Sequence, residues 1–184
     1  RRVDLLGERG DGQLAEHLNV TKQAASQMIE ELVTKGYVTR RPHPDDARAR
    51  LAEAPQEALG ELEGGHGTAF ASGMAATHAL ITAVCSAGDH IVLPDDLYGG
   101  TYRLADKVLT RWGLAYTMVD QRDLAAVRAA IRPETRMVFI ETPTNPMLHI
   151  TDIQCASSLA HKKNVRVIVD NTFATPYLQQ PLEL

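Results

Sequence analysis

The sequence predicts an α/β fold in which helices cover both faces of a mostly parallel sheet. From about residue 55, helical patterns alternate with short β-branched runs. Runs such as VFIE and VRVIVD are apolar without strict alternation, which is typical of strands buried on both faces. Residues 1–50 differ in charge, with nine Lys and Arg against eight Asp and Glu, whereas residues 51–184 carry ten against fifteen. We therefore expect two domains, 1–52 and 53–184.

Composition places the chain among globular proteins. Of its 184 residues, 44% are hydrophobic and 23% are charged, and the net charge is −4. No apolar run approaches the roughly 20 residues that cross a bilayer, and the first residues do not resemble a signal peptide, so we expect a cytoplasmic protein without a membrane partner. Cys85 and Cys155 form no metal-binding or disulfide pattern, and we expect buried free thiols. The histidines show no ligand spacing either, so we expect no metal site.

The first fifty residues predict two helices and a turn. Residues 13–18 place Leu14, Ala15 and Leu18 on one face, and Asn19-Val20-Thr21 then interrupts the pattern. A second helix follows, with an apolar stripe that closes at Lys35-Gly36. Thr21 is the expected N-cap. The polar residues at the start of this helix are types that contact DNA, and the candidates are Thr21, Lys22, Gln23, Ser26 and Gln27.

A basic hairpin is expected directly after that helix. Tyr37-Val38-Thr39 is a short β pattern, and the following segment RRPHPDDARAR contains Arg40, Arg41, Arg48 and Arg50. The order of helix, turn, helix and basic wing resembles the winged helix-turn-helix of the MarR family, which implies duplex DNA as a partner. The flanking residues do not resemble that family's dimerisation helices, so we expect weak binding. An amphipathic helix with a solvated polar face is the structural alternative.

The second part predicts alternating strands and helices. Expected strands are Thr68–Ala71, His90–Pro94, Ala115–Val119, Met137–Glu141 and Val165–Asp170. Expected helices follow at about 74–86, 100–111, 123–131 and 152–162, and a further helix carries Glu61 and Glu63 on a solvated face.

Candidate site residues lie where these strands end. Gly73 and Met74 begin a helix directly after a strand, so their backbone N–H groups can bind phosphate. Tyr98 precedes two glycines and can stack on a flat ring. Asn145 offers an amide from the turn ETPTNP. Asp170 ends an apolar strand, where a lone carboxylate is costly unless it meets a cation.

A phosphate cradle, a stacking ring, an amide and a carboxylate on successive strand ends together predict a site for pyridoxal 5′-phosphate (PLP). The motifs LEGGHGTAFASGMAA, DDLYGGTYR, ETPTNP and VDNTFATPYLQQPLEL resemble the transsulfuration family of PLP enzymes, which includes cystathionine γ-synthase and cystathionine lyases. The resemblance implies part of a type I PLP fold and a sulfur-containing amino acid as substrate. It implies Gly73 and Met74 on the phosphate, Tyr98 over the ring, Asn145 near the phenolic oxygen and Asp170 on the ring nitrogen.

The resemblance also implies a Schiff-base lysine in a Ser-x-Thr-Lys motif shortly after LQQPLEL. None of the five lysines, Lys22, Lys35, Lys107, Lys162 and Lys163, lies in that motif. The family's Tyr-x-Arg phosphate clamp and its C-terminal substrate domain are not matched either. We therefore expect no catalytic residue in this polypeptide, no covalent attachment of PLP and no transsulfuration by this chain alone.

The leading hypothesis is a PLP-binding fragment of a cystathionine γ-synthase/lyase-like enzyme, a C–S lyase or transferase of amino-acid metabolism, joined to a DNA-binding-type winged helix. We expect a homo-oligomer. The abrupt junction near residue 52 also allows an artefactual join of two truncated genes. The alternative function is that of a MarR-like transcription regulator with a PLP-fold sensor domain.

Overall fold

The computed structural model describes residues 22–34, 39–42, 50–53 and 56–184. The chain divides into two compact units, Arg1–Ala76 and Thr77–Leu184, and each is described by itself. The described elements of the first unit are α3 (Lys22–Thr34), β1 (Thr39–Pro42), β2 (Arg50–Glu53), α4 (Gln56–Glu63) and the start of α5 (Gly73–Val84). Those of the second, after the end of α5, are β3 (His90–Pro94), α6 (Gly99–Arg103), a π-helical segment (Leu104–Leu109), β4 (Ala115–Val119), α7 (Leu124–Ala130), β5 (Thr135–Glu141), α8 (Ile153–His161), β6 (Arg166–Asp170), α9 (Thr175–Leu178) and a 3₁₀ turn (Pro181–Glu183).

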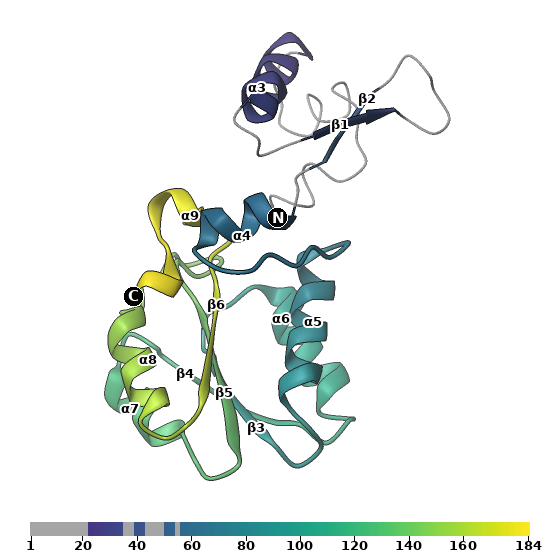
Figure 1. Cartoon of the computed structure of the whole chain (residues 1–184). Coiled ribbons are helices and arrows are strands. Elements are labelled where there is room, and N and C mark those ends of the chain that lie inside the picture. Colours follow the sequence, from purple (N-terminus) through teal and green to yellow (C-terminus); the bar gives the residue numbers. More distant parts are fainter. Residues whose placement is uncertain (1–21, 35–38, 43–49, 54–55) are drawn as a thin grey trace. The chain divides into compact units, whose positions relative to one another are not determined.

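The second unit is built on a four-stranded parallel sheet in the order β4-β3-β5-β6. Figure 1 shows α7 and α8 on one side of this sheet, and α6 and residues 77–84 of α5 on the other. Parallel neighbours need crossover connections, and the helices between the strands supply them. The α/β prediction is therefore confirmed, and all four of these strands lie where the apolar runs predicted them.

Apolar side chains from the sheet and from α7 and α8 form one core cluster. Burying these side chains stabilises the unit. The strands contribute few polar residues because both of their faces are covered. The cluster consists of Val92, Val127, Ile131, Val138, Ile140, Ala156, Ala160 and Val165.

The helices also follow the sequence patterns, with local differences. Asp123 caps α7 by accepting from the N–H groups of Ala125 and Ala126, and Asp152 caps α8 by accepting from Cys155 N. The expected helix at 100–111 is helical, but its second part is wound as a π-helix. Cys85 is a buried free thiol as expected, whereas Cys155 is exposed in the first turn of α8, contrary to the prediction.

The predicted strand Thr68–Ala71 is wrong. These residues carry no strand assignment, and no strand in the described ranges pairs with them. A short extended segment becomes a strand only when a neighbour completes its hydrogen-bond ladder. The β propensity of residues 68–71 does not show whether such a neighbouring strand exists.

Two glycines, Gly60 in α4 and Gly67 at the end of the LEGGHG motif, shape the turn after α4. After α4, which confirms the expected helix around Glu61 and Glu63, the chain turns back so that Gly65 N donates to Gly60 O at 2.8 Å. A Cβ on Gly60 would lie 2.5 Å from Gly65 O, and one on Gly67 would collide with Gln56 O. The turn therefore requires residues without side chains.

The N-terminal predictions are only partly covered. α3 begins at Lys22 and contains the buried Ile29, which belongs to the expected apolar stripe, and β1 and β2 pair antiparallel at the position of the expected hairpin. Residues 13–18, Thr21 and Arg48 lie outside the described residues. A helix followed by a hairpin agrees with the predicted order, but the winged helix itself stays a prediction.

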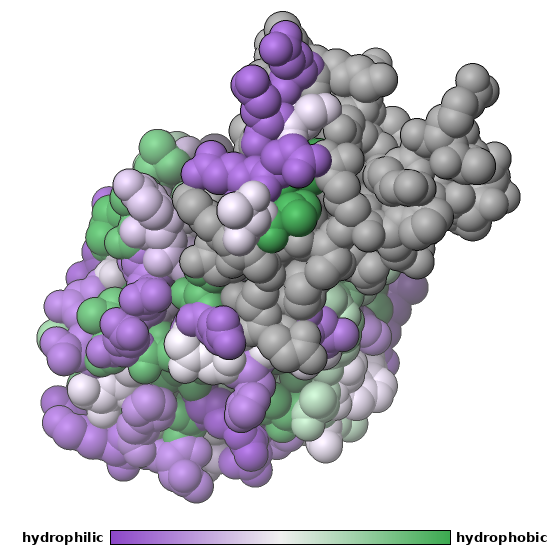
Figure 2. All heavy atoms as spheres, turned by 45° about the horizontal axis from the view of Figure 1, so that its top comes forward, coloured by the Kyte–Doolittle hydropathy of each residue, from purple (hydrophilic) through white to green (hydrophobic). Residues whose placement is uncertain are grey.

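The described residues contain neither a membrane-spanning helix nor a metal site. None of their helices is both long and apolar enough to cross a membrane. No group of three or more His, Cys, Asp or Glu side chains in the same ranges is placed to hold a metal ion. The coloured atoms in Figure 2 are mostly hydrophilic on the face shown, with hydrophobic side chains interspersed.

A buried histidine joins three strands near their amino ends. His90 is fully buried, with Nδ1 2.8 Å from Thr135 Oγ1 on β5 and Nε2 2.9 Å from Thr117 Oγ1 on β4. Each threonine hydroxyl can donate or accept, so a neutral imidazole with one donating and one accepting nitrogen fits these partners. Burial, and secondly the charge of Arg132, lower the pKa of His90 to about 4.

We predict that His90 makes stability fall as the pH is lowered. Below a pH of about 6.5 the unfolded chain binds a proton at His90, while the folded chain resists protonation until the pH is about 4. The free energy of unfolding should fall by roughly 2 to 4 kcal/mol across this window because of His90. Urea denaturation of the wild type and of His90→Gln tests this, since the variant should show a smaller decrease. His78→Gln, on an exposed position of α5, is the control, and equal decreases in wild type and His90→Gln would contradict the prediction.

Candidate cofactor site at the carboxyl edge of the sheet

Two parallel strands end side by side in carboxylates. Glu141 is the last residue of β5 and Asp170 is the last residue of β6, and the two are register partners. Parallel strands bring their carboxyl ends to one edge, where α/β proteins bind ligands. The edge of this sheet therefore carries two adjacent acidic groups.

Glu141 connects the two loops that carry Tyr98 and Asn145. Its side chain is buried, with the residue 4% exposed. Tyr98 N donates to Glu141 Oε2 at 2.9 Å and to Oε1 at 3.1 Å, and Asn145 N donates to Oε1 at 2.8 Å. Tyr98 and Asn145 are both half-buried. Three sequence-predicted residues, Tyr98, Asn145 and Asp170, thus share one neighbour.

Asp170 differs from the lone carboxylate that the sequence suggested. Its Oδ1 accepts from both the N–H and the hydroxyl of Thr172, and its neighbour across the register is another acid. Among the described residues, no Lys or Arg forms an ion pair with Asp170 or Glu141. The expected cation is therefore not supplied by the described side chains, and the edge can receive one from a ligand.

The electrostatics of this edge act most strongly on Glu141. The pKa of Glu141 is raised to about 7, chiefly by burial and secondly by the charges of Asp170 and Asp96, whereas the N–H groups of Tyr98 and Asn145 act in the opposite direction. Near neutral pH its carboxyl is consequently divided between the neutral and the ionised form.

A second carboxylate, Asp96, also connects these two loops, but it belongs to the loop after β3 and accepts from the loop after β5. Its Oδ2 accepts from the hydroxyl of Thr144 and from Met147 N at 3.0 Å. His149 Nδ1 lies 4.0 Å from the same oxygen. Asp96 follows β3 and its partners follow β5, so the two loops are connected twice.

Gln179, near the end of the chain, also contacts these strand ends. Its Nε2 donates to Thr142 O at 3.1 Å and to Asn171 Oδ1 at 2.9 Å, while Asn171 Nδ2 donates to Gln179 O at 2.8 Å. These bonds tie the segment after α9 to the residues that follow β5 and β6.

Gly73 and Met74 begin α5, as the sequence predicted for a phosphate cradle. Ser72 Oγ accepts from Ala75 N at 3.1 Å at this helix start. A Cβ placed on Gly73 would meet no atom within 4 Å. These residues belong to the first unit, and the helix start by itself has the backbone donors that bind anions.

The predicted DNA-contact residues are described in part. Gln23 and Gln27 are exposed on α3 as expected, whereas Ser26 is half-buried. Lys22 begins α3, and Arg40 and Arg41 lie in β1. Thr21 and Arg48 lie outside the described residues.

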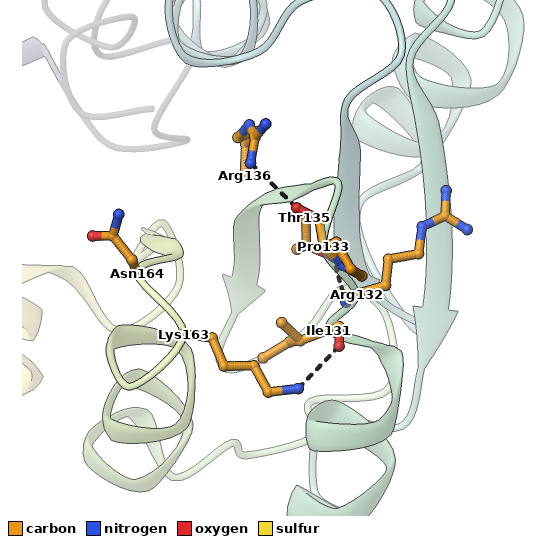
Figure 3. A pocket seen from close by; sticks show the side chains of 7 residues that line it. All are labelled: Ile131, Arg132, Pro133, Thr135, Arg136, Lys163 and Asn164. Atoms are coloured by element: carbon orange, nitrogen blue, oxygen red, sulfur yellow. Dashed lines mark hydrogen bonds between the residues drawn. The ribbon is translucent and has the colours of Figure 1, made fainter.

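A hollow of about 290 Å³ lies at the opposite, amino edge of the sheet (Figure 3). Its cations have partners within the chain: Lys163 Nζ donates to Ile131 O at 3.1 Å, Arg136 pairs with Asp89 at 3.0 Å and Arg132 pairs with Glu134 at 3.4 Å. None of the predicted site residues lines it. We therefore locate the candidate site at the carboxyl edge and not in this hollow.

Glu141 is the residue that sequence reasoning missed. A carboxylate at the end of an apolar strand is costly without partners, and this signal, which selected Asp170, applies equally to Glu141. The sequence pattern places Glu141 only in the expected strand and in the motif ETPTNP.

Comparison with known proteins agrees with the motifs. A model of the family described as Cys/Met metabolism PLP-dependent enzyme matches residues 24–184. Cystathionine gamma-synthase from Mycobacterium tuberculosis (strain ATCC 25618 / H37Rv) is 56% identical over 122 residues, which cover 66% of this chain and 31% of that protein. Cystathionine beta-lyase from Lactococcus lactis subsp. cremoris is 53% identical over 132 residues, covering 71% and 34%.

A solved structure is also similar to this chain. The crystal structure of metB from Corynebacterium glutamicum matches with a TM-score of 0.69 at 52% identity, covering 70% of this chain and 34% of that chain. The chain thus spans about a third of the length of these relatives. The family match begins inside α3 and overlaps the predicted winged helix. Since that match extends over most of the sequence, the chain belongs to the Cys/Met metabolism PLP-dependent enzyme family, whose cofactor is pyridoxal 5′-phosphate.

Proposed function

We propose that this chain is a PLP-binding part of a cystathionine γ-synthase/lyase-like enzyme of transsulfuration. The observation that carries the proposal is the convergence of Tyr98, Asn145 and Asp170 on Glu141 at the carboxyl edge of the sheet. When bound, PLP acts as an electron sink for amino-acid chemistry. The proposal includes a sulfur-containing amino acid as substrate, a homo-oligomeric assembly and the cytoplasmic location expected from the sequence.

Each site residue fits one part of the cofactor. Asp170, supported by the adjacent acid Glu141, would stabilise the protonated ring nitrogen. Tyr98 would cover the face of the ring and limit access of water, and the amide of Asn145 would donate to the phenolic oxygen. Gly73 and Met74 would bind the phosphate with the N–H groups at the start of α5.

The sequence shared with the relatives supports cofactor binding more directly than a particular reaction. A synthase and a β-lyase are each more than 50% identical to this chain over the matched residues. We propose that these residues supply the function common to both enzymes, which is holding PLP. The five lysines of this chain lie outside a Ser-x-Thr-Lys context, so we propose noncovalent binding and no transsulfuration by this stretch alone.

We predict that Asp170→Asn weakens PLP binding at least about tenfold, because a charge-assisted hydrogen bond becomes a neutral one. Titration of the full chain with PLP, followed by fluorescence quenching, measures the dissociation constant. Asp152→Asn is the matched control, since asparagine also caps a helix and Asp152 lies at the exposed start of α8. Absence of binding to the wild type, or equal affinity of Asp170→Asn, would contradict the proposal. Mass spectrometry after borohydride treatment should find no lysine-linked cofactor.

We also propose DNA binding by the N-terminal segment as a second function, in a MarR-like regulator with a PLP-fold sensor. The supporting observation is α3, with exposed Gln23 and Gln27, followed by the antiparallel pair β1 and β2 that contains Arg40 and Arg41. A winged helix uses these two elements to contact a base edge and the phosphate backbone.

Replacing Arg40 and Arg41 by alanine should weaken duplex binding and reduce the salt dependence. Each lost phosphate contact lowers the slope of log K against log salt by about 0.9, so the double variant should lose about 1.8. Fluorescence anisotropy at several salt concentrations measures this slope. Arg128→Ala, on an exposed position of α7, is the control. If the wild type does not bind duplex DNA even at low salt, this second function is excluded.

A further inference from the structure

The two loops at the carboxyl edge are held together by backbone-to-carboxylate bonds. Glu141 accepts from Tyr98 N and Asn145 N, at separations of 43 and 4 residues along the chain. Asp96 accepts from the hydroxyl of Thr144 and from Met147 N. Each loop thus contacts a carboxylate from the other, so neither loop can shift without breaking bonds to its neighbour.

Glu141 is the central member because it contacts both residues that are proposed to face the ring. Its Oε1 accepts from Tyr98 N at 3.1 Å and from Asn145 N at 2.8 Å, and its Oε2 accepts from Tyr98 N at 2.9 Å. These bonds are made by the backbone N–H groups of Tyr98 and Asn145. A buried acceptor of this kind fixes two backbone positions relative to each other.

We propose that Glu141 is a positioning residue that holds the Tyr98 and Asn145 loops in the arrangement that receives the cofactor before the cofactor binds. This inference rests on the proposed PLP function for the identity of the ligand. Because β5 ends at Glu141, the carboxylate is fixed by the sheet, and the loops take their positions from it. Preorganised loops reduce the entropy that binding must otherwise remove.

The contact requires a carboxylate and not merely a polar side chain of the same size. Two N–H groups point at it, and both carboxylate oxygens accept. Glutamine offers one accepting oxygen, and its NH₂ group can only donate. In Glu141→Gln at least one of the bonds to Tyr98 N is therefore replaced by a contact between donors.

The surroundings of Glu141 cause its carboxyl group to titrate near neutral pH. Burial raises the pKa of Glu141 to about 7, and Asp170 on β6 and Asp96 after β3 act in the same direction. The ionised carboxylate accepts hydrogen bonds more strongly than the neutral acid. Both bound amide protons should therefore respond to one protonation event.

The first experiment measures hydrogen exchange by NMR on the full chain without PLP. In Glu141→Gln, the amides of Tyr98 and Asn145 should exchange at least about tenfold faster, because their shared acceptor is weakened. The strand amides of Val92 and Val138 serve as the internal reference. Asp123→Asn is the matched control, since Asp123 also accepts from two backbone N–H groups but lies at the start of α7. Unchanged exchange at Tyr98 and Asn145, or a rise no larger than at Val92 and Val138, would overturn the proposal.

The second experiment uses the wild type and does not depend on the folding of any variant. Amide proton shifts of Tyr98 and Asn145 are followed between about pH 5 and pH 9. Both should move downfield with one common midpoint near pH 7 as Glu141 ionises. Separate midpoints, or shifts that do not titrate, would overturn the shared role of Glu141. In a folded Glu141→Gln the common titration should disappear.

The third measurement separates this inference from the proposed function. PLP should bind Glu141→Gln at least about tenfold more weakly than the wild type, while Asp123→Asn binds normally. If the wild type shows the common titration but no response to PLP, the proposed function fails and with it the cofactor role of Glu141. If PLP binds the wild type and Glu141→Gln equally, the function stands and the positioning role is wrong.

Discussion

The parallel register of β5 and β6 is the constraint on which the candidate site depends. It ends both strands together and so places Glu141 directly beside Asp170. Two adjacent carboxylates at the end of a buried sheet repel each other and lose solvation. The surrounding loops supply hydrogen-bond donors to both carboxylates. Glu141 accepts from backbone N–H groups, and Asp170 accepts from the N–H and the hydroxyl of Thr172. The loop conformations are thus partly a consequence of the charge at the strand ends.

Donors satisfy the oxygen atoms but do not neutralise the charge. No described Lys or Arg forms an ion pair with either acid, and the described cationic cluster of Arg132, Arg136 and Lys163 lies at the opposite edge. The charge asymmetry between the two edges follows from the positions of these residues at the two ends of the same strands. A ligand with a cationic ring fits the acidic edge, and this agrees with the cofactor of the family.

Much of this arrangement could be predicted from the sequence because its causes are local. The apolar runs fixed the positions of β3, β4, β5 and β6, and the rule that ligands bind where parallel strands end selected Tyr98, Asn145 and Asp170. The strand expected at Thr68–Ala71 failed because pairing depends on a distant neighbour. Glu141 carries the same local signal as Asp170, a carboxylate at the end of an apolar strand, but its bond to Tyr98 spans 43 residues, so no local pattern predicts that it connects the two loops.

The effect of Glu141 on the free energy of unfolding indicates that a carboxyl group at this position has a role beyond stabilising the fold. A carboxyl group with a pKa raised to about 7 in the folded chain binds a proton more tightly there than when unfolded. The free energy of unfolding therefore falls as the pH rises from about 4.5 to about 7, by roughly 3 kcal/mol for a shift of this size. An apolar residue would avoid this loss, but it could not accept from the backbone of two loops. Strongly perturbed groups in such positions are concentrated at functional sites, and here the perturbed group is the one that joins the residues predicted to face the ligand.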